Sequence, residues 1–222
     1  MKKTITLACA AVITVSAFSQ KIKVKESTET IGGGNHNALV VKLFDVNPSD
    51  AEEEFKSFMK TYDGKRSSME GAVFIDNAVI TAIGNNTIDV YGKASGKKGD
   101  PEISFTVAFD LGGSFLNSSE HKAQYNVAEK IVSDFAIKTV RNAIEKQLRD
   151  TKKIQAKLED EQKDLEKENR ELNSDIEDYK IKIKKAEDDV MKNQTAQDRK
   201  KEEIEAQKKV VGETDLKLKA VN

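Results

Sequence analysis

The C-terminal third of the chain restricts the possible folds more than any other segment. Residues 149–222 carry 19 basic and 20 acidic residues, no proline and one glycine, Gly212. A compact core needs apolar side chains and turns, and this segment offers few of either, whereas a long solvated helix accommodates charges on most of its surface. The composition therefore predicts one long charged helix over residues 149–222.

A seven-residue repeat within this segment predicts a coiled coil. With Ile176 counted as an a position, apolar residues recur at a or d positions of successive heptads. This apolar row, which we expect to form an oligomer interface, consists of Leu158, Leu165, Leu172, Ile176, Tyr179, Ile183, Val190, Ile204, Val211 and Leu218. Only one of the two core positions is apolar over much of the length, because Gln155, Gln162 and Asn169 occupy the early a positions. We therefore expect a homodimer of modest affinity, and a trimer, a helical hairpin or a solitary helix held by local ion pairs are the alternatives.

Charges beside the apolar row favour a parallel, in-register pair of helices. In that arrangement each g residue faces the e residue five positions later on the partner helix. Three such pairs attract and a fourth repels; the attractive pairs are Asp175 with Lys180, Lys182 with Glu187 and Glu203 with Lys208, and the repulsive pair is Glu161 with Glu166. Exposed pairs are weak, so they select the register more than they stabilise it.

The aromatic and turn-forming residues lie upstream of the charged segment. Every phenylalanine occurs at or before Phe135, and both prolines and all glycines except Gly212 precede residue 148. Alternating or β-branched runs predict strands within residues 22–30, 38–44, 71–83, 87–94 and 102–111, and residues 71–83 read as one or two strands. A helix is predicted from Pro48, capped by Asn47, to Gly64, and a second helix begins near Asn117. Residues 20–148 should therefore form one small α+β domain, an antiparallel sheet of about five strands with one or two packed helices.

The first 19 residues are typical of a secretory signal peptide. Two lysines precede an uncharged apolar run that is too short to span a membrane, and the small residues Ala17 and Ser19 suit a signal-peptidase site. Cleavage there would remove Cys9, the only cysteine, and with it any disulfide or cysteine-ligated metal. We expect an exported protein, periplasmic or secreted, of bacterial type.

The chain that remains after removal of the signal has the features of neither a nucleic-acid-binding nor a membrane-spanning protein. Loss of Lys2 and Lys3 leaves 35 basic residues against 38 acidic ones, a net charge of −3. No stretch combines clustered cations with aromatics, so we expect no nucleic acid as a partner. No apolar run after the signal approaches the ~20 residues of a spanning helix.

One glycine-rich stretch invites comparison with a phosphate-binding loop. Three consecutive glycines begin the segment Gly32, Gly33, Gly34, Asn35, His36 and Asn37, which is the one candidate ligand loop. A dinucleotide or P-loop site needs glycines that follow a strand and open a helix, whereas these glycines lead into a predicted strand. A turn that permits positive φ between two strands is the favoured interpretation.

No catalytic, metal or cofactor site is predicted. The chain has two histidines, His36 and His121, and they are not paired at metal-ligand spacing on a helix. No serine lies in a nucleophile elbow. The many carboxylates of the C-terminal third are what a solvated helix requires. We therefore expect no enzyme.

Three functional hypotheses follow. The first is a non-enzymatic envelope protein whose coiled coil serves as a spacer or dimerisation rod, while the α+β domain binds an envelope protein partner. The second rests on architecture: a small β-containing body with long helices resembles the tentacled periplasmic chaperones that hold unfolded outer-membrane proteins, which implies holdase activity. That family is basic, whereas this chain is slightly acidic. The third hypothesis is a small-ligand-binding domain.

Overall fold

The computed structural model describes residues 22–220. The strands and helices are β1 (Val24–Ile31), β2 (Gly34–Phe44), α1 (Pro48–Phe58), the 3-10 helix η1 (Met59–Tyr62), β3 (Lys65–Met69), β4 (Ala72–Ala78), β5 (Ile88–Ser95), β6 (Glu102–Asp110) and α2 (Lys122–Ala220). The predicted signal peptide, residues 1–19, lies outside the described residues. The chain divides into two compact units, residues 1–150 and 151–222, which places the division two residues beyond the expected domain end.

The first unit contains one antiparallel sheet with the strand order β1-β2-β6-β5-β4-β3. The expected α+β class is confirmed, with six strands in place of about five. The additional strand is β3, which is exposed along its whole length and has no apolar alternation to predict it. It pairs with β4 through a two-residue turn in which Glu70 and Gly71 both have positive φ, and that local turn holds the strand.

Residues 71–83, expected to form one or two strands, contain the single strand β4. Strand β4 ends at Ala78 after a register irregularity at Asn77, which has positive φ and donates its backbone N–H to Asp89. Beyond β4 the chain is held by other hydrogen bonds, because the N–H of Val79 donates to the carbonyl of Tyr62 at 2.7 Å. The apolar residues Ile80 and Ile83 are buried although they lie outside the strands. An apolar run of this kind predicts burial more reliably than it predicts a strand.

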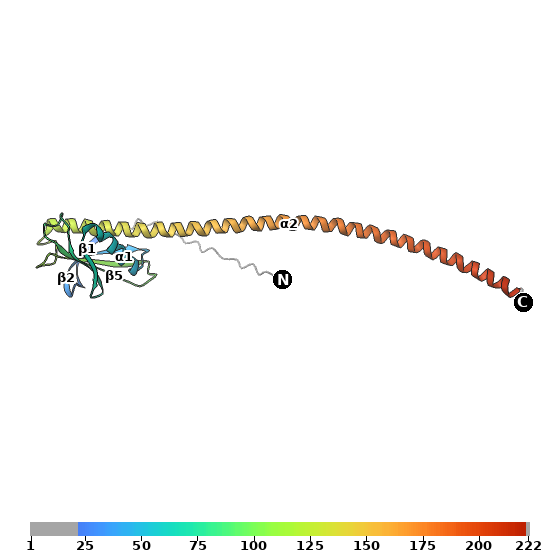
Figure 1. The fold of residues 1–222 in the computed structure, drawn as a ribbon, viewed down its shortest axis with the longest axis horizontal. Coiled ribbons are helices and arrows are strands. Elements are labelled where there is room, and N and C mark those ends of the chain that lie inside the picture. Colours follow the sequence, from blue (N-terminus) through green and yellow to red (C-terminus); the bar gives the residue numbers. More distant parts are fainter. Residues whose placement is uncertain (1–21, 221–222) are drawn as a thin grey trace. The chain divides into compact units, whose positions relative to one another are not determined.

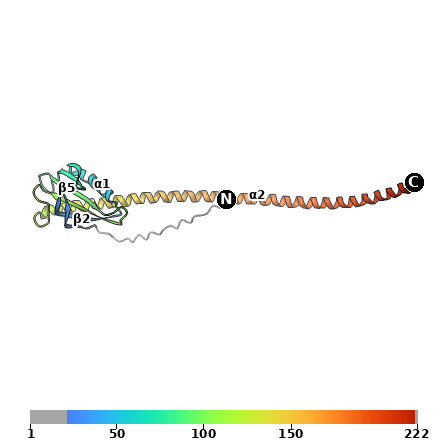
Figure 2. The same cartoon turned by 90° about the horizontal axis from the view of Figure 1, so that it is seen from below.

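The main core lies on one face of the sheet, where α1 and the first turns of α2 cover it (Figures 1 and 2). Alternate residues of β2 and β6, such as Leu39, Val41 and Phe105, point to this face, as the period of two requires. The 3.6-residue period of α2 brings Ala128 and Phe135 to the same core. The first turns of the long helix thus belong to the α+β unit.

An aromatic cluster holds both helices against the sheet. The ring of Phe135 in α2 lies 5.2 Å from that of Phe55 in α1 and 4.8 Å from that of Phe105 in β6, measured between centroids. Phe55 reaches the sheet at Gly92, where a Cβ atom would lie only 2.3 Å from the ring carbon Cε1 of Phe55. The absence of a side chain at residue 92 therefore sets how closely α1 approaches β5.

The second helix begins later than Asn117. Residues 118–120 form a turn, in which Asn117 accepts the N–H of Glu120 at 2.7 Å and donates its own amide to the Glu120 carboxylate at 2.9 Å. Asn117 and Glu120 thus bond reciprocally, with the Asn117 side-chain amide as the donor in place of the backbone N–H of a capping box. This turn precedes α2, which begins at Lys122.

Replacement of Gly92 by alanine should destabilise the fold, because the new methyl group would occupy the space of the Phe55 ring. Overpacking of this kind typically costs about 1–3 kcal/mol, which thermal or urea unfolding would measure. Gly113→Ala is the matched control, because no atom lies within 4 Å of its Cβ position and its φ is not in the left-handed region. Equal stability of the two variants would contradict the close approach of α1.

A chain ending at Leu148 should fold without residues 149–222. It keeps the α2 side chains that complete the core, from Ala128 to Thr139, so it should unfold cooperatively in a thermal scan. A chain ending at Glu120 is the control and should not fold, because it lacks Phe135. Failure of the longer chain would mean that the core needs residues beyond 148.

Candidate functional site

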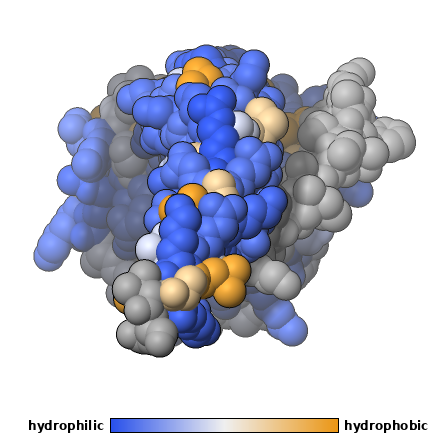
Figure 3. Space-filling view, turned by 90° about the vertical axis from the view of Figure 1, so that its right-hand side faces the viewer, coloured by the Kyte–Doolittle hydropathy of each residue, from blue (hydrophilic) through white to orange (hydrophobic). Residues whose placement is uncertain are grey.

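The apolar row of α2 is exposed along the described part of the helix. Every residue from Ile144 to Ala220 is exposed, and the ten side chains of the apolar row are 47% to 69% exposed. Figure 3, which looks at the C-terminal end of α2, shows apolar atoms as separate spots among hydrophilic ones. Each of these side chains alone is ordinary for a protein surface, but their seven-residue spacing aligns them along one side of the helix.

The row continues upstream along the helix. Ile144 and Leu148, 49% and 52% exposed, occupy the preceding d and a positions of the same heptad frame. Upstream of them Phe135 is buried in the core. The single chain therefore leaves the row uncovered from Ile144 onwards.

Polar residues interrupt the apolar row, and several of them bond within the helix. Gln155 donates to Glu159 at 2.8 Å, and Gln197 donates to Asn193 at 2.5 Å. The side chains of Gln155, Glu159, Gln197 and Asn193 therefore have hydrogen-bond partners within the single helix and do not need a second chain for them. Whether the row forms an oligomer interface stays a prediction.

Two of the three glycines form a hairpin turn, and the third begins β2. Gly32 and Gly33, with φ of +65° and +84°, connect β1 to β2, so the expectation of positive φ between two strands is confirmed. The rest of the candidate ligand loop, residues 34–37, lies within β2. The turn packs against the protein, since a Cβ on Gly32 would lie 3.3 Å from ring carbons of Tyr91.

An aromatic cluster occupies the second face of the sheet. His36 stacks on Phe115, with ring centroids 3.7 Å apart and an angle of 10° between the planes. Phe74 and Tyr91 lie in the same cluster, with their ring centroids 4.8 Å apart. The buried residues Ala38 and Ala108 belong to it as well, so this face holds a small second core around His36.

Tyr91 supplies the phenol of this cluster. Burial raises its pKa above the ordinary value of 10.0, and the negative charges of Asp89, Asp110, Glu70 and Asp76 raise it further. A phenol that resists ionisation is a hydrogen-bonding and packing group at neutral pH.

His121 does not form a catalytic pair. Its Nδ1 atom is buried and has no hydrogen-bond partner among the described residues, while its backbone N–H donates to the carbonyl of Asn117 at 3.1 Å. Across residues 22–220, no three histidine, cysteine, aspartate or glutamate side chains gather as a metal site would require. In the same residues, no helix is both long and apolar enough to cross a membrane.

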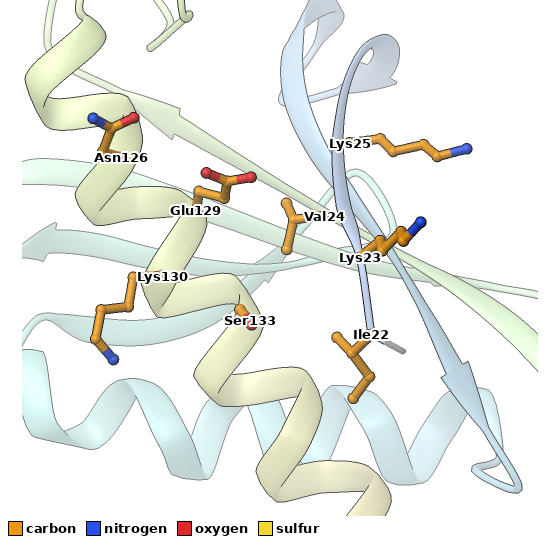
Figure 4. A pocket seen from close by; sticks show the side chains of 8 residues that line it. All are labelled: Ile22, Lys23, Val24, Lys25, Asn126, Glu129, Lys130 and Ser133. Atoms are coloured by element: carbon orange, nitrogen blue, oxygen red, sulfur yellow. The ribbon is translucent and has the colours of Figure 1, made fainter. Parts of the chain in front are cut away.

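An open groove of about 470 Å³ lies between β1 and the first turns of α2 (Figure 4). Ile22 and Val24 form its strand side, and Asn126, Glu129 and Ser133 form its helix side. Figure 4 shows Val24 and Glu129 pointing toward each other across it. This groove was not predicted from the sequence, although Asn126, Glu129 and Ser133 recur at the helical period beside the apolar residues of α2.

Comparisons with known proteins give no functional assignment for these surfaces. No protein-family model, curated protein or solved structure matches the chain.

Tyrosine ionisation should reduce the stability of the α+β unit at alkaline pH. The pKa values of Tyr62 and Tyr125 are raised as well, chiefly by burial, so the folded state holds phenolic protons that the unfolded chain releases nearer pH 10. The stabilisation is complete below pH 10 and should be lost as the pH rises through the higher folded-state values. Urea unfolding at several pH values measures this loss, and Tyr91→Phe should make it less steep.

The control is a spectroscopic titration of tyrosinate in folded and urea-unfolded protein. The folded curve should lie at higher pH for the buried tyrosines. Coincident curves would contradict the role given to burial.

Proposed function

We propose that this protein is an exported, non-enzymatic bacterial envelope protein that dimerises through α2, forms a spacer, and binds an envelope partner through its α+β unit. The observation that supports it most is the exposed apolar row of α2, repeated at heptad spacing from Ile144 to Leu218. Export is supported by the signal-like sequence of residues 1–19. At 1.5 Å per residue, residues 151–220 extend about 105 Å, enough for a spacer.

Burial of the apolar row supplies the driving force for dimerisation. Full burial of a large aliphatic side chain contributes about 1.5–3 kcal/mol. Association first costs about 4–15 kcal/mol in lost translational and rotational freedom, which the contacts must offset. The ten side chains on each helix are already partly covered by their own helix, and the layers between them contain Gln162, Asn193 and Lys200, so a dimer would bury less apolar surface than a fully apolar seam. A modest, concentration-dependent affinity follows.

Local ion pairs alone explain the helix less well. Lys180 lies 2.8 Å from Glu177 and Lys208 lies 2.7 Å from Glu205, each three residues away. Such exposed pairs contribute about 0.2–0.5 kcal/mol each. They do not account for β-branched residues at Ile176, Ile183 and Val190, where a two-stranded parallel coiled coil favours them.

Charge favours the parallel register within this proposal. Lys180 and Lys208 would exchange their local partners for Asp175 and Glu203 of a second chain. Because one exposed ion pair replaces another, the exchange adds little stability. Its effect is to disfavour registers in which these lysines meet cations.

Holding unfolded clients is the second candidate function, and the same exposed row favours it. Apolar side chains spaced along a charged helix can contact unfolded segments weakly at many points. A dimer seam would cover these side chains, so self-association distinguishes the two functions. A holdase would keep the row free and would suppress the aggregation of unfolded outer-membrane proteins.

The double substitution Ile183→Lys and Val190→Lys should convert a dimer into monomers. Two buried a positions would then hold like charges on both helices. Sedimentation equilibrium over a range of concentrations measures the change, which should be a loss of at least about tenfold in association. Circular dichroism should show the α+β unit unchanged, because both residues lie in the second unit.

Ile181→Lys with Met191→Lys is the matched control. It adds the same two lysines and removes apolar residues that are 68% and 64% exposed, but at positions outside the a and d rows. Association should persist in this variant. A parent protein that sediments as a monomer at every attainable concentration would rule out the coiled coil and leave a solitary charged helix.

A further inference from the structure

We propose that the outer edge of β1 pairs with β1 of a second copy, which joins two sheets into one antiparallel sheet. This interface lies in the α+β unit and is separate from the proposed coiled coil. Strand β1 has eight residues and lies at one end of the strand order. An edge strand of this length leaves backbone donors and acceptors available to another strand.

The hairpin geometry identifies the free backbone groups. Ile31 and Gly34 flank a two-residue turn, so they form the hydrogen-bonded pair that closes the hairpin. Every second residue from Ile31 then bonds to β2, and the residues between point their N–H and C=O groups outward. The outward-pointing residues are Val24, Glu26, Thr28 and Thr30. Among the described residues, no hydrogen bond to their backbone groups crosses this outer edge.

The side chains of β1 complement those of an inverted copy. When Ser27 faces Ser27 of the second strand, Lys25 lies opposite Glu29 of the partner copy, and Glu29 lies opposite its Lys25. This register also makes the outward residues hydrogen-bond to each other, Glu26 with Thr28 and Val24 with Thr30, as an antiparallel ladder requires. Neither Lys25 nor Glu29 forms an ion pair within the described chain. Opposite charges directly across a ladder stabilise it by about 0.2–1 kcal/mol per pair.

Adjacent registers fit less well. A shift that centres the pairing on Glu26 sets two glutamates directly opposite each other. A shift that centres it on Thr28 leaves Lys25 opposite Ile31 and makes no attractive pair. In the register centred on Ser27, the two Glu26 side chains are diagonal neighbours. Each can keep the bonds it already makes to its own Ser118, whose N–H donates at 2.9 Å.

The opposite edge of the sheet provides an internal comparison. Strand β3 has five residues, among them Lys65 and Arg66 and no acidic residue. No antiparallel register of two β3 strands can form an attractive pair of charges. The other surroundings of β1 leave room for a partner, because the groove beside Val24 is open to solvent (Figure 4). These differences select β1 as the pairing edge.

A disulfide at the symmetry axis tests the register in the full chain. With Cys9→Ser present, Ser27→Cys supplies one thiol, which should face its counterpart in a non-hydrogen-bonded pair and cross-link when diamide is added. Ser67→Cys, at the centre of β3, is the matched control and should cross-link at least about tenfold more slowly. Equal cross-linking rates for the Ser27→Cys and Ser67→Cys variants would overturn the proposal.

Exchanging the charges of Lys25 and Glu29 tests whether the partner strand is β1 of a second copy. Added to the Ser27→Cys chain, Lys25→Glu or Glu29→Lys alone should slow cross-linking roughly tenfold, because both ion pairs become repulsive. Both changes together should restore the rate. A mixture of the two single variants should give mainly the mixed disulfide, which ion exchange separates. Unchanged rates, or a double variant as slow as the singles, would overturn the pairing.

Hydrogen exchange distinguishes a second copy from other possible occupants of this edge. The amides of Val24, Glu26, Thr28 and Thr30 should gain protection as the concentration of the parent protein rises, and Thr28→Pro should abolish that gain. Protection that is independent of concentration would mean that the chain's own residues cover the edge. Protection that appears only with a foreign peptide would assign the edge to another protein. Either result would overturn self-pairing.

Discussion

The packing of Phe135 is the contact on which both parts of the molecule depend. Its ring touches α1 through Phe55 and Phe58 and touches the sheet through Phe105. Because Phe135 lies within α2, the same helix both closes the core and supplies the exposed heptads. Core packing therefore holds the start of α2 in place, and the heptad pattern that begins at Ile144 continues from an anchored helix.

The two faces of the sheet divide the possible functions. One face is filled by α1 and α2, and the other carries the cluster of His36, Phe74, Tyr91 and Phe115. His36, the one histidine near the glycine turn, stacks on Phe115 within this cluster. The described residues present three further surfaces: the edge of β1, the groove beside it and the row on α2.

The sequence predicted the elements whose pattern reflects burial. Strands with alternation or β-branched residues, such as β2 and β6, were found, as was the helix that begins at Pro48. Strand β3 was not predictable from its own residues, because its side chains are exposed and its pairing comes from the Glu70-Gly71 turn. The groove and the free edge of β1 were missed for a related reason: they depend on strand order, which is a tertiary property. The heptad row was visible in the sequence because a long helix keeps its pattern without tertiary help.

Two weak contacts in one chain can support one assembly. A parallel coiled coil would bring the first turns of α2 of two copies to the same end, and with them two β1 strands on short tethers. Within such a dimer the two β1 strands would meet at an effective concentration in the millimolar range, which is high enough for a contact of low affinity to form. Both contacts are isologous, so they close a dimer when they join the same two chains and would build an open chain of molecules when they do not. The proposed ion pair between Lys25 and Glu29 favours the closed form under one geometric condition. The two β1 strands must be able to meet antiparallel about the same twofold axis as the coil. This shared axis links the two interfaces.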